Sequence, residues 1–304
     1  MRFFTKAVCA VLAVFALSVG ASFGMGQQSN ARELTAGYTY LIAGLDDAAQ
    51  NTDVISVMNI SKEGRISLLQ IPRDTYINRD GKTSKLNAFY PSSRRDGASA
   101  EEGMKKLSDL VSELLAVNID GYVALTVEAF HAIIARLGGV DIELQAPIRI
   151  SDELTLGVGK NHLDADTAVR LVRHRASYKR ADLDRLDIQG LFYTALFDKI
   201  LDATVADVLA IYKAISSDGT VSLSLSDAVK LFGMREAMRV TSIKKYTLPG
   251  LAAPDNNGVW YYFVKRSSAA SLVGEVFGAD FYKFDKNEIL LNKTEQKFID
   301  IYNS

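Results

Sequence analysis

The amino-acid sequence predicts an α/β fold: a single-domain α/β sandwich with a mixed central sheet between helical layers, preceded by an N-terminal transmembrane helix. Three observations predict it. Apolar runs of strand length alternate with segments of helical spacing, neither a long linker nor a repeat interrupts them, and an uncharged apolar stretch opens the chain. With 304 residues, of which 48% are hydrophobic, the chain can bury a substantial core.

The chain begins with a short basic segment followed by a long apolar one. Residues 7–26 carry no charge, and their length is close to the ~20 residues that a helix needs to cross the hydrocarbon core. Arg2 and Lys6 precede this stretch, so the positive-inside bias places residues 1–6 in the cytoplasm and the rest of the chain outside the cell. A cleaved signal peptide is the alternative, because small residues follow the strongest apolar run. Both interpretations export the globular part of the protein.

The remaining domain organisation follows from this start. Residues 27–37 form a polar linker, residues 38–277 the predicted extracellular domain, and residues 278–304 a C-terminal tail. The only cysteine, Cys9, lies in the apolar stretch. The folded part therefore has neither a disulfide nor a cysteine nucleophile.

The first elements of the domain are predicted to be three strands. Residues 38–45, 54–60 and 65–71 are apolar runs of strand length. The second and third runs are separated by Ser61-Lys62-Glu63-Gly64, which is a good hairpin connection. Pro72 closes the third strand, because proline cannot donate to a sheet ladder.

Helices and further strands alternate after this meander. Apolar residues at helical spacing predict helices at about residues 100–117, 127–137 and 182–201. The second of these helices is predicted to stop at Gly138-Gly139. Short strands are predicted at residues 122–125 and 140–144. Less regular patterns indicate a helix at 226–238 and a strand at 259–264.

Two aspartates lie where neighbouring strands are predicted to end and begin. Asp46 follows the first strand, and Asp53 opens the second. Carboxylate oxygens suit a hard cation such as Mg²⁺, which keeps several waters and shares its shell with substrate phosphate. The alternative is that these aspartates are only turn or cap residues.

A second group of charged residues follows the third strand. Arg73 and Asp74 come directly after it, and Lys85 and Asn87 lie a short distance along the chain. A cation just beyond a buried strand projects into the crevice where ligands of α/β sheets bind. An ordinary surface ion pair between Arg73 and Asp74 is the alternative.

The third group is the densest in cations. Arg173, Arg175, Asp182, Arg185 and Gln189 fall within one short stretch. Cations this close repel one another unless an anion lies among them, and arginine forks match phosphate oxygens. Arg185 and Gln189 would share one face of the predicted helix. The alternative is a solvated basic helix end.

The balance of charges argues against nucleic-acid binding, and the placement of the histidines argues against a zinc site. The 35 Lys and Arg residues balance the 36 Asp and Glu residues, so no overall field holds nucleic acid along the surface. The three histidines, His131, His162 and His174, are scattered, and no pair has the spacing of zinc ligands.

Taken in order, the three charged groups resemble the signature of the LytR-CpsA-Psr family of bacterial cell-wall enzymes. The resemblance covers roughly residues 38–277 and depends on the ordered set of motifs. In one departure, Asn51 stands where the family usually has an arginine before the second acid. The matching motifs are Gly44-Leu45-Asp46 with Asp53, Gln70-Ile71-Pro72-Arg73-Asp74-Thr75, Lys85-Leu86-Asn87-Ala88-Phe89-Tyr90, Leu137-Gly138-Gly139-Val140-Asp141, Arg173-His174-Arg175, and Asp182 with Arg185 and Gln189.

The resemblance implies a Mg²⁺-dependent phosphotransferase with an apolar pocket for a polyprenyl chain. It would move a glycopolymer, of teichoic acid or capsular polysaccharide type, from an undecaprenyl-pyrophosphate carrier to peptidoglycan outside the cytoplasmic membrane. Asp46 and Asp53 would hold Mg²⁺, and Asp74 or Asp182 would accept a proton. Phosphate or substrate binding falls to the remaining motif residues, which are Arg73, Lys85, Asn87, Arg173, Arg175, Arg185 and Gln189.

Two other functions remain open at this stage. A pyrophosphatase that hydrolyses the lipid carrier needs the same acids and arginines. A non-catalytic regulator or lipid-binding membrane protein needs no chemistry at all, although the exported placement and the lack of a basic helix-turn-helix pattern argue against nucleic-acid contact.

Overall fold

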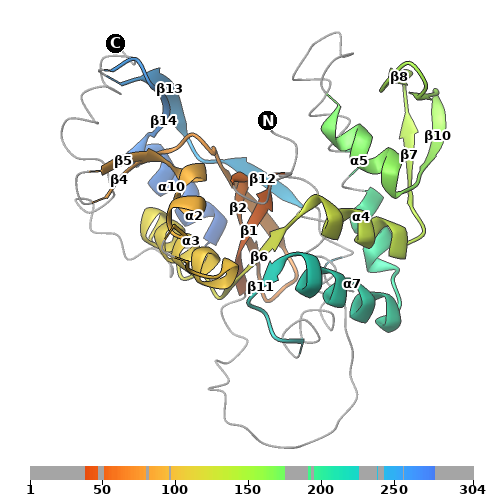
Figure 1. The fold of residues 1–304 in the computed structure, drawn as a ribbon, viewed down its shortest axis with the longest axis horizontal. Coiled ribbons are helices and arrows are strands. Elements are labelled where there is room, and N and C mark those ends of the chain that lie inside the picture. The colour runs from red at the N-terminus through yellow and green to blue at the C-terminus, as the bar shows by residue number, and fades with distance from the viewer. Residues whose placement is uncertain are drawn as a thin grey trace, which may run out of the picture. The chain divides into compact units, whose positions relative to one another are not determined.

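The computed structural model describes residues 38–46, 51–79, 82–95, 97–174, 191–192, 195–225, 238, 243–255 and 257–277 (Figure 1). These residues form the mixed α/β fold that the sequence predicts, with a central mixed sheet and helices. They fall into two compact units, which we describe separately. The sheet unit contains the described part of residues 34–124 and 242–304, and the helical unit contains the described part of residues 125–241.

The predicted transmembrane helix, residues 7–26, lies outside the described residues. Among the residues that the structure describes, no helix is both long enough and apolar enough to span a membrane.

The sheet unit is built on a mixed sheet with the strand order β6-β1-β2-β3-β12. The first three strands form an antiparallel meander, whereas β12 runs parallel to β3. The strands are β1 (Tyr38–Leu45), β2 (Thr52–Ile60), β3 (Ile66–Ile71), β6 (Gly121–Leu125) and β12 (Lys244–Thr247).

The meander confirms the predicted strands and hairpin. The turn between β2 and β3 is closed by a 2.9 Å hydrogen bond from the Gly64 amide to the Ser61 carbonyl. Gly64 has a φ of +79°, a conformation that glycine adopts without a steric penalty. The third strand ends at Ile71, directly before Pro72, as expected.

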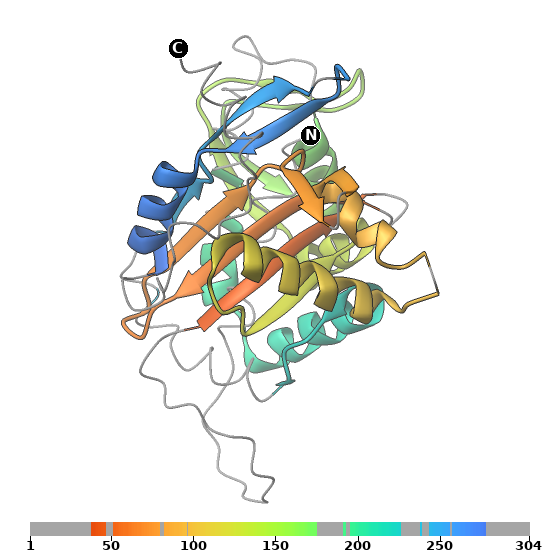
Figure 2. The ribbon, with the colours of Figure 1, turned by 90° about the vertical axis from the view of Figure 1, so that its left-hand side faces the viewer.

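Both faces of the meander are buried. The helices α3 (Ala100–Leu115) and α10 (Arg266–Phe277) share one apolar core with this sheet, and Figure 2 shows α3 in front of the strands. A capping box between Ser99 and Glu102 starts α3, which satisfies amides at its N-terminus. The opposite face carries Tyr40 and other side chains that are almost fully buried. The centre of the sheet is thus shielded from water, and its edges carry the polar groups.

Two hairpins and a short helical segment complete the sheet unit. The hairpin formed by residues 250–264 attaches to the chain just after β3, because the Tyr262 amide donates to the Asp74 carbonyl over 2.8 Å. An aromatic cluster joins the two hairpins: the Tyr76 ring lies 5.0 Å from that of Tyr261 and 5.1 Å from that of Phe263. The elements are β4 (Tyr76–Arg79), β5 (Lys82–Lys85), η1 (Leu86–Ala88), α2 (Phe89–Ser92), β13 (Gly250–Pro254) and β14 (Trp260–Val264).

The helical unit packs α4 against α5 and α7. Residues 191–192 and 195–201 are also helical, which agrees with the predicted helix at 182–201, while residues 182–190 lie outside the described residues. Of the helix predicted at 226–238, only Met238 is described, and it is helical. The elements are α4 (Val127–Arg136), β7 (Val140–Leu144), β8 (Ile148–Arg149), β9 (Thr155–Leu156), β10 (Gly159–Leu163), α5 (Ala165–Arg173), α7 (Val205–Asp218) and β11 (Thr220–Val221).

A pair of glycines ends α4 as the sequence predicts, and the two have different surroundings. Gly138 and Gly139 have φ values of +71° and +87°. A Cβ added at Gly138 would have nothing within 4 Å, whereas one added at Gly139 would lie 2.6 Å from His162 Nε2 and 2.7 Å from the Leu163 carbonyl oxygen. Conformation alone therefore requires the first glycine, and close packing also requires the second.

We expect Gly139→Ala to destabilise the protein more than Gly138→Ala. The Gly138 variant adds only left-handed backbone strain, which costs about 1 to 2 kcal/mol. The Gly139 variant adds a clash with backbone as well and should cost roughly 3 kcal/mol or more. Urea unfolding of the two variants measures both losses. Equal losses would contradict the packing at Gly139.

Candidate functional site

The charged residues of the sheet unit gather at one edge of the sheet because of strand direction. Asp46 follows the end of β1, Asp53 lies at the start of β2, and Arg73 follows the end of β3. In an antiparallel meander the end of one strand lies beside the start of the next. Lysine and arginine side chains therefore come to lie beside carboxylates from separate parts of the chain. We call the cluster of Asp46, Asp53, Arg73, Asp74 and Lys85 the edge site.

A β-bulge positions Asp53. Gly44 pairs with Val54, but the next residue of β1, Leu45, pairs with Thr52, so Asp53 is the extra residue of β2. Bulges re-aim a side chain and are frequent beside functional sites. The Asp53 carboxylate is directed to Arg73, whose Nη1 donates to its Oδ1 over 2.6 Å. The sequence pattern alone did not reveal this bulge.

Arg73 is the central cation of the edge site. Its side chain is only 21% exposed, and its Nε lies 3.8 Å from Asp74 Oδ2, which is an ion-pair distance and not a hydrogen bond. Within the described part of the chain, this buried Nε has no hydrogen-bond partner. Buried donors are almost always satisfied, so an unsatisfied guanidinium nitrogen indicates a place for an anionic acceptor.

The predicted surface pair of Arg73 with Asp74 is thus only part of the arrangement. Lys85 Nζ lies 3.0 Å from Asp74 Oδ1 and 5.9 Å from the centre of the Tyr261 ring. Two cations and two carboxylates alternate across the edge site, from Asp53 through Arg73 and Asp74 to Lys85. The two inner members of this row, Arg73 and Asp74, each lie within ion-pair distance of two charges.

Asn87 acts on this cluster through its backbone. Its amide donates to the Arg73 carbonyl over 3.0 Å, and its carbonyl accepts from Thr52 Oγ1 over 3.4 Å. The segment that carries Lys85 and Asn87 is therefore fastened between the strand that holds Asp53 and the residue that supplies the guanidinium. These two hydrogen bonds hold the motif of Lys85 and Asn87 close to the motif of Arg73 and Asp74.

Asp46 is held by Asn51, a contact that the sequence alone did not predict. Asn51 Nδ2 donates to Asp46 Oδ2 over 2.8 Å, and the Asp46 amide donates to the Asn51 carbonyl over 3.0 Å. Asn51 occupies the position of the arginine in the motif quoted above. Here the shorter amide side chain orients the first acid.

The edge site contains three acids, and two of them, Asp46 and Asp53, are the predicted metal ligands. Within the described ranges, no group of three or more His, Cys, Asp or Glu side chains is arranged to hold a metal ion. Mg²⁺ is commonly held by one or two carboxylates together with water and substrate phosphate. Asp46 and Asp53, on adjacent strand ends and with oxygen donors, fit that pattern.

The third charged group begins at a helix end. Arg170 and Arg173 are exposed in the last turn of α5, where cations are favoured by the helix dipole. The backbone is helical at Arg173 and extended at His174, so at Arg173 the structure agrees with the alternative of a basic helix end. Arg175, Asp182, Arg185 and Gln189 lie outside the described residues, and their convergence with the edge site remains a prediction.

His174 fixes where the chain leaves α5. Its side chain is buried and is hydrogen-bonded to the backbone of Ile150. Burial lowers the pKa of His174 from its usual value of 6.5, because a charged imidazole loses hydration there. The unfolded chain therefore binds this proton at a higher pH than the folded chain does.

We expect acid to destabilise the helical unit through this residue. The contribution of neutral His174 to stability is complete above its unfolded pKa of about 6.5 and is lost as the pH falls toward the lowered folded pKa. Thermal unfolding at a series of pH values measures this loss. In His174→Gln the acid-side fall in melting temperature should be smaller, and an unchanged fall would contradict the assignment.

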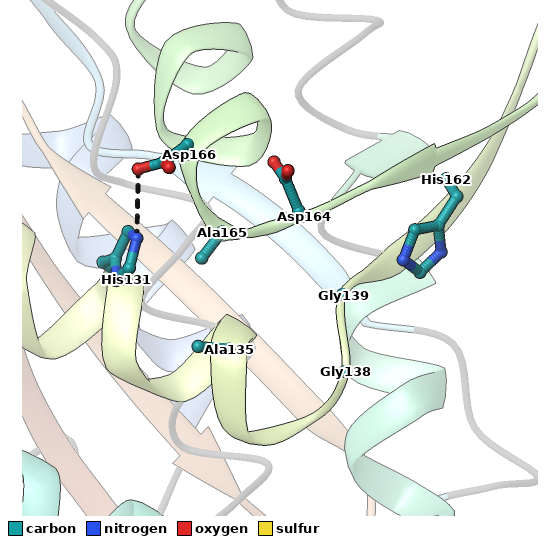
Figure 3. Close-up of a pocket in the computed structure, with 8 residues that line it drawn as sticks. All are labelled: His131, Ala135, Gly138, Gly139, His162, Asp164, Ala165 and Asp166. Carbon is teal, nitrogen blue, oxygen red and sulfur yellow. Dashed lines mark hydrogen bonds and ion pairs between the residues drawn. The ribbon is translucent and has the colours of Figure 1, made fainter.

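The helical unit has a pocket that sequence reasoning missed. It has a volume of about 330 Å³ and is lined from α4, the glycine pair and the start of α5 (Figure 3). His131 Nε2 lies 3.1 Å from Asp166 Oδ1, and His162 Nδ1 lies 2.7 Å from Asp141 Oδ1. The hydrogen bond to His162 lowers the pKa of Asp141. These histidines are far apart in sequence, so only the fold brings them to one pocket.

Comparison with solved structures confirms the fold class. The fold matches protein gbs0355 of Streptococcus agalactiae with a TM-score of 0.70 at 19% identity, covering 90% of this chain and 98% of the other. It matches TagV of Bacillus subtilis with a TM-score of 0.59 at 22% identity, covering 88% and 98%. These likenesses establish a shared α/β architecture.

The chain belongs to the LytR_cpsA_psr family, whose sequence model matches residues 21–277. One relative is the polyisoprenyl-teichoic acid–peptidoglycan teichoic acid transferase TagV of Bacillus subtilis (strain 168). It is 24% identical over 246 residues, which are 74% of this chain and 60% of the relative. The chain thus spans less than two thirds of that relative's length. The family resemblance found in the motifs is confirmed.

Proposed function

We propose that the protein transfers a glycopolymer from a polyprenyl-pyrophosphate carrier to peptidoglycan at the outer surface of the cytoplasmic membrane. The observation that carries this proposal is the edge site, where a buried guanidinium nitrogen has no hydrogen-bond partner within the described part of the chain. Membership of the family and the transferase name of the TagV relative support the reaction class.

Arg73 and Lys85 bind phosphate oxygens in this proposal. Their partners, Asp53 and Asp74, hold both cations in place before substrate arrives. Phosphoryl transfer needs little covalent chemistry from the protein, and its rate depends on positioning and on neutralising charge. An edge site with preoriented cations meets that requirement. The apolar pocket for the polyprenyl chain remains part of the proposal.

Asp46 and Asp53 would hold Mg²⁺ beside the pyrophosphate. The bound ion would neutralise charge on the phosphate oxygens. Asn51 fixes one of these carboxylates and Arg73 the other, so both acids are oriented by a hydrogen bond. When the pyrophosphate binds, its oxygens can take over Arg73 and leave the Asp53 carboxylate to the cation.

Pyrophosphate binding beyond the edge site, substrate orientation and proton transfer are assigned to other residues of the family motifs. Arg173, Arg175 and Arg185 would complete the binding of the pyrophosphate, and Gln189 would orient a phosphate oxygen or the glycan. A sugar hydroxyl of peptidoglycan attacks the phosphorus that bears the glycan. The bond from that phosphorus to the bridging oxygen breaks, polyprenyl phosphate leaves, and the hydroxyl proton goes to Asp74 or Asp182.

Location supports the same reaction. With residues 7–26 as an uncleaved anchor, the catalytic domain lies outside the cell beside both the lipid-borne donor and its wall acceptor. A single-pass placement of this kind brings the two substrates together at one surface.

We expect Arg73→Ala to abolish most transfer without unfolding the protein. Loss of one phosphate-binding donor should cost about 2 to 4 kcal/mol of transition-state stabilisation. Arg65→Ala is the matched control, because Arg65 lies just before β3 as Arg73 lies just after it, and it pairs only with the exposed Glu63 in this turn. Product analysis after incubation with lipid-linked glycan and peptidoglycan measures transfer.

Full transfer by Arg73→Ala would refute the role of the edge site. Release of free phosphorylated glycan by the wild type, with none joined to peptidoglycan, would identify a pyrophosphatase in place of a transferase.

We expect Asp53→Asn to weaken the binding of a divalent cation. The substitution removes a charged oxygen ligand but keeps the shape of the side chain. Titration of the wild type and the variant with Mn²⁺ as a probe, in the presence of an isoprenoid pyrophosphate, measures this affinity directly. Equal Mn²⁺ affinity in both proteins would exclude Asp53 as a ligand.

A further inference from the structure

The turn of the β13–β14 hairpin exposes two adjacent apolar side chains. Val259 is 43% exposed and Trp260 is 59% exposed. Trp260 is also the only tryptophan of the chain. Trp and a neighbouring aliphatic residue at a protruding turn are typical of a surface that leaves water for a partner, and tryptophan is enriched where protein meets lipid headgroups.

We propose that this hairpin tip inserts into the headgroup layer of a lipid bilayer and thereby holds the edge site at the membrane surface. The proposal rests on the function proposed above, because a lipid-borne pyrophosphate is found only at that surface.

Four backbone amides of the tip, those of Asp255, Asn257, Gly258 and Val259, find their acceptors within the turn itself. The Asp255 carboxylate accepts from the amides of Asn257 and Val259, over 2.9 and 2.8 Å. The Asp255 amide donates to the Val259 carbonyl over 2.8 Å, and the Gly258 amide donates to the Asp255 carbonyl over 3.0 Å. Backbone groups that keep their partners can leave water at low cost.

The hairpin is fastened to the edge site by its backbone. Tyr262 donates its amide to the Asp74 carbonyl over 2.8 Å and forms a parallel bridge with Thr75. Trp260 lies only two residues before Tyr262 in β14, which is about 7 Å of strand. Figure 2 shows the hairpin beside β4 and β5 at this edge of the sheet. A contact at the tip therefore fixes the height of Arg73 and Lys85 above the bilayer.

The length of the N-terminal linker permits this orientation. The apolar stretch ends at residue 26 and β1 begins at Tyr38, so residues 27–37 can span at most about 40 Å. The eight residues of β1 carry the chain about 27 Å from Tyr38 toward the edge site. The maximal span of the linker exceeds the length of β1. A chain anchored by residues 7–26 can therefore turn its edge site toward the bilayer while the anchor stays in the membrane.

The single tryptophan makes a direct test possible. The full chain is reconstituted into vesicles of phosphatidylethanolamine and phosphatidylglycerol, with and without brominated acyl chains. We expect brominated lipid to quench the fluorescence of Trp260 and vesicles to shield it from acrylamide in the water. Full acrylamide access together with no quenching by brominated lipid would overturn the proposal.

Two matched variants test whether the tip is responsible. Val259→Asp places a charge beside the reporter and should remove most of the quenching by brominated lipid. Val158→Asp alters a more exposed valine, 67% against 43% for Val259, in the helical unit and should leave the quenching unchanged. Circular dichroism verifies that both variants are folded. Equal quenching in the two variants would show that lipid reaches Trp260 by another route and would overturn the assignment to the tip.

The same preparation separates this proposal from its alternatives. Soluble peptidoglycan fragments that shield Trp260 from acrylamide, where brominated lipid does not quench it, would identify a glycan surface and overturn lipid contact. Lipid quenching without any transfer would refute the proposed function and leave the hairpin contact standing. Transfer by a protein whose Trp260 stays in water would refute the hairpin contact alone.

Discussion

The antiparallel pairing of β1, β2 and β3 is the constraint on which the edge site depends. Reversal of chain direction at each turn brings residues twenty positions apart, such as Asp53 and Arg73, to one side of the sheet. The 2.6 Å ion pair between Arg73 and Asp53 exists only because β2 begins where β3 ends. A buried sheet centre supports this geometry, since charged groups cannot enter the core and must lie at its edges.

The cations of the edge site are paired with carboxylates, but one buried hydrogen-bond donor has no partner within the described part of the chain. Each cation has a carboxylate partner, yet Arg73 keeps a nitrogen unsatisfied and Lys85 lies over an aromatic face. Such a cluster is rigid before a ligand arrives, and an added anion gains more from it than from a flexible surface lysine. In the proposed reaction, the carboxylates would then be released for other contacts. Ordered charge and ligand binding are therefore properties of the same side chains.

Local sequence predicted the elements that carry strong apolar patterns. The bounds of β1 match the apolar run at residues 38–45, and α4 ends at the predicted glycine pair. Strand β12 was missed because its sequence, Lys-Lys-Tyr-Thr, is polar, and its pairing with β3 joins residues far apart in the chain. Helix α5 was missed because Arg170 and Arg173 were interpreted by charge alone. The bulge at Asp53 depends on the register between two strands, which no single strand encodes.

The edge site could be predicted in composition but not in its pairings. Asp46, Asp53, Arg73 and Lys85 were recognised from ordered motifs. The partner of each charge depends on side-chain directions that the fold determines, as with Asn51 and Asp46.

The loop between Asp46 and Asn51 can change in length without moving the acids beside it. Its base is closed by a backbone hydrogen bond and a side-chain hydrogen bond between the same two residues. Insertions between them would lengthen a loop at small entropic cost and would leave both acids in place. The length of this loop can therefore change between homologous chains while the acids on which the proposed metal site depends keep their orientation.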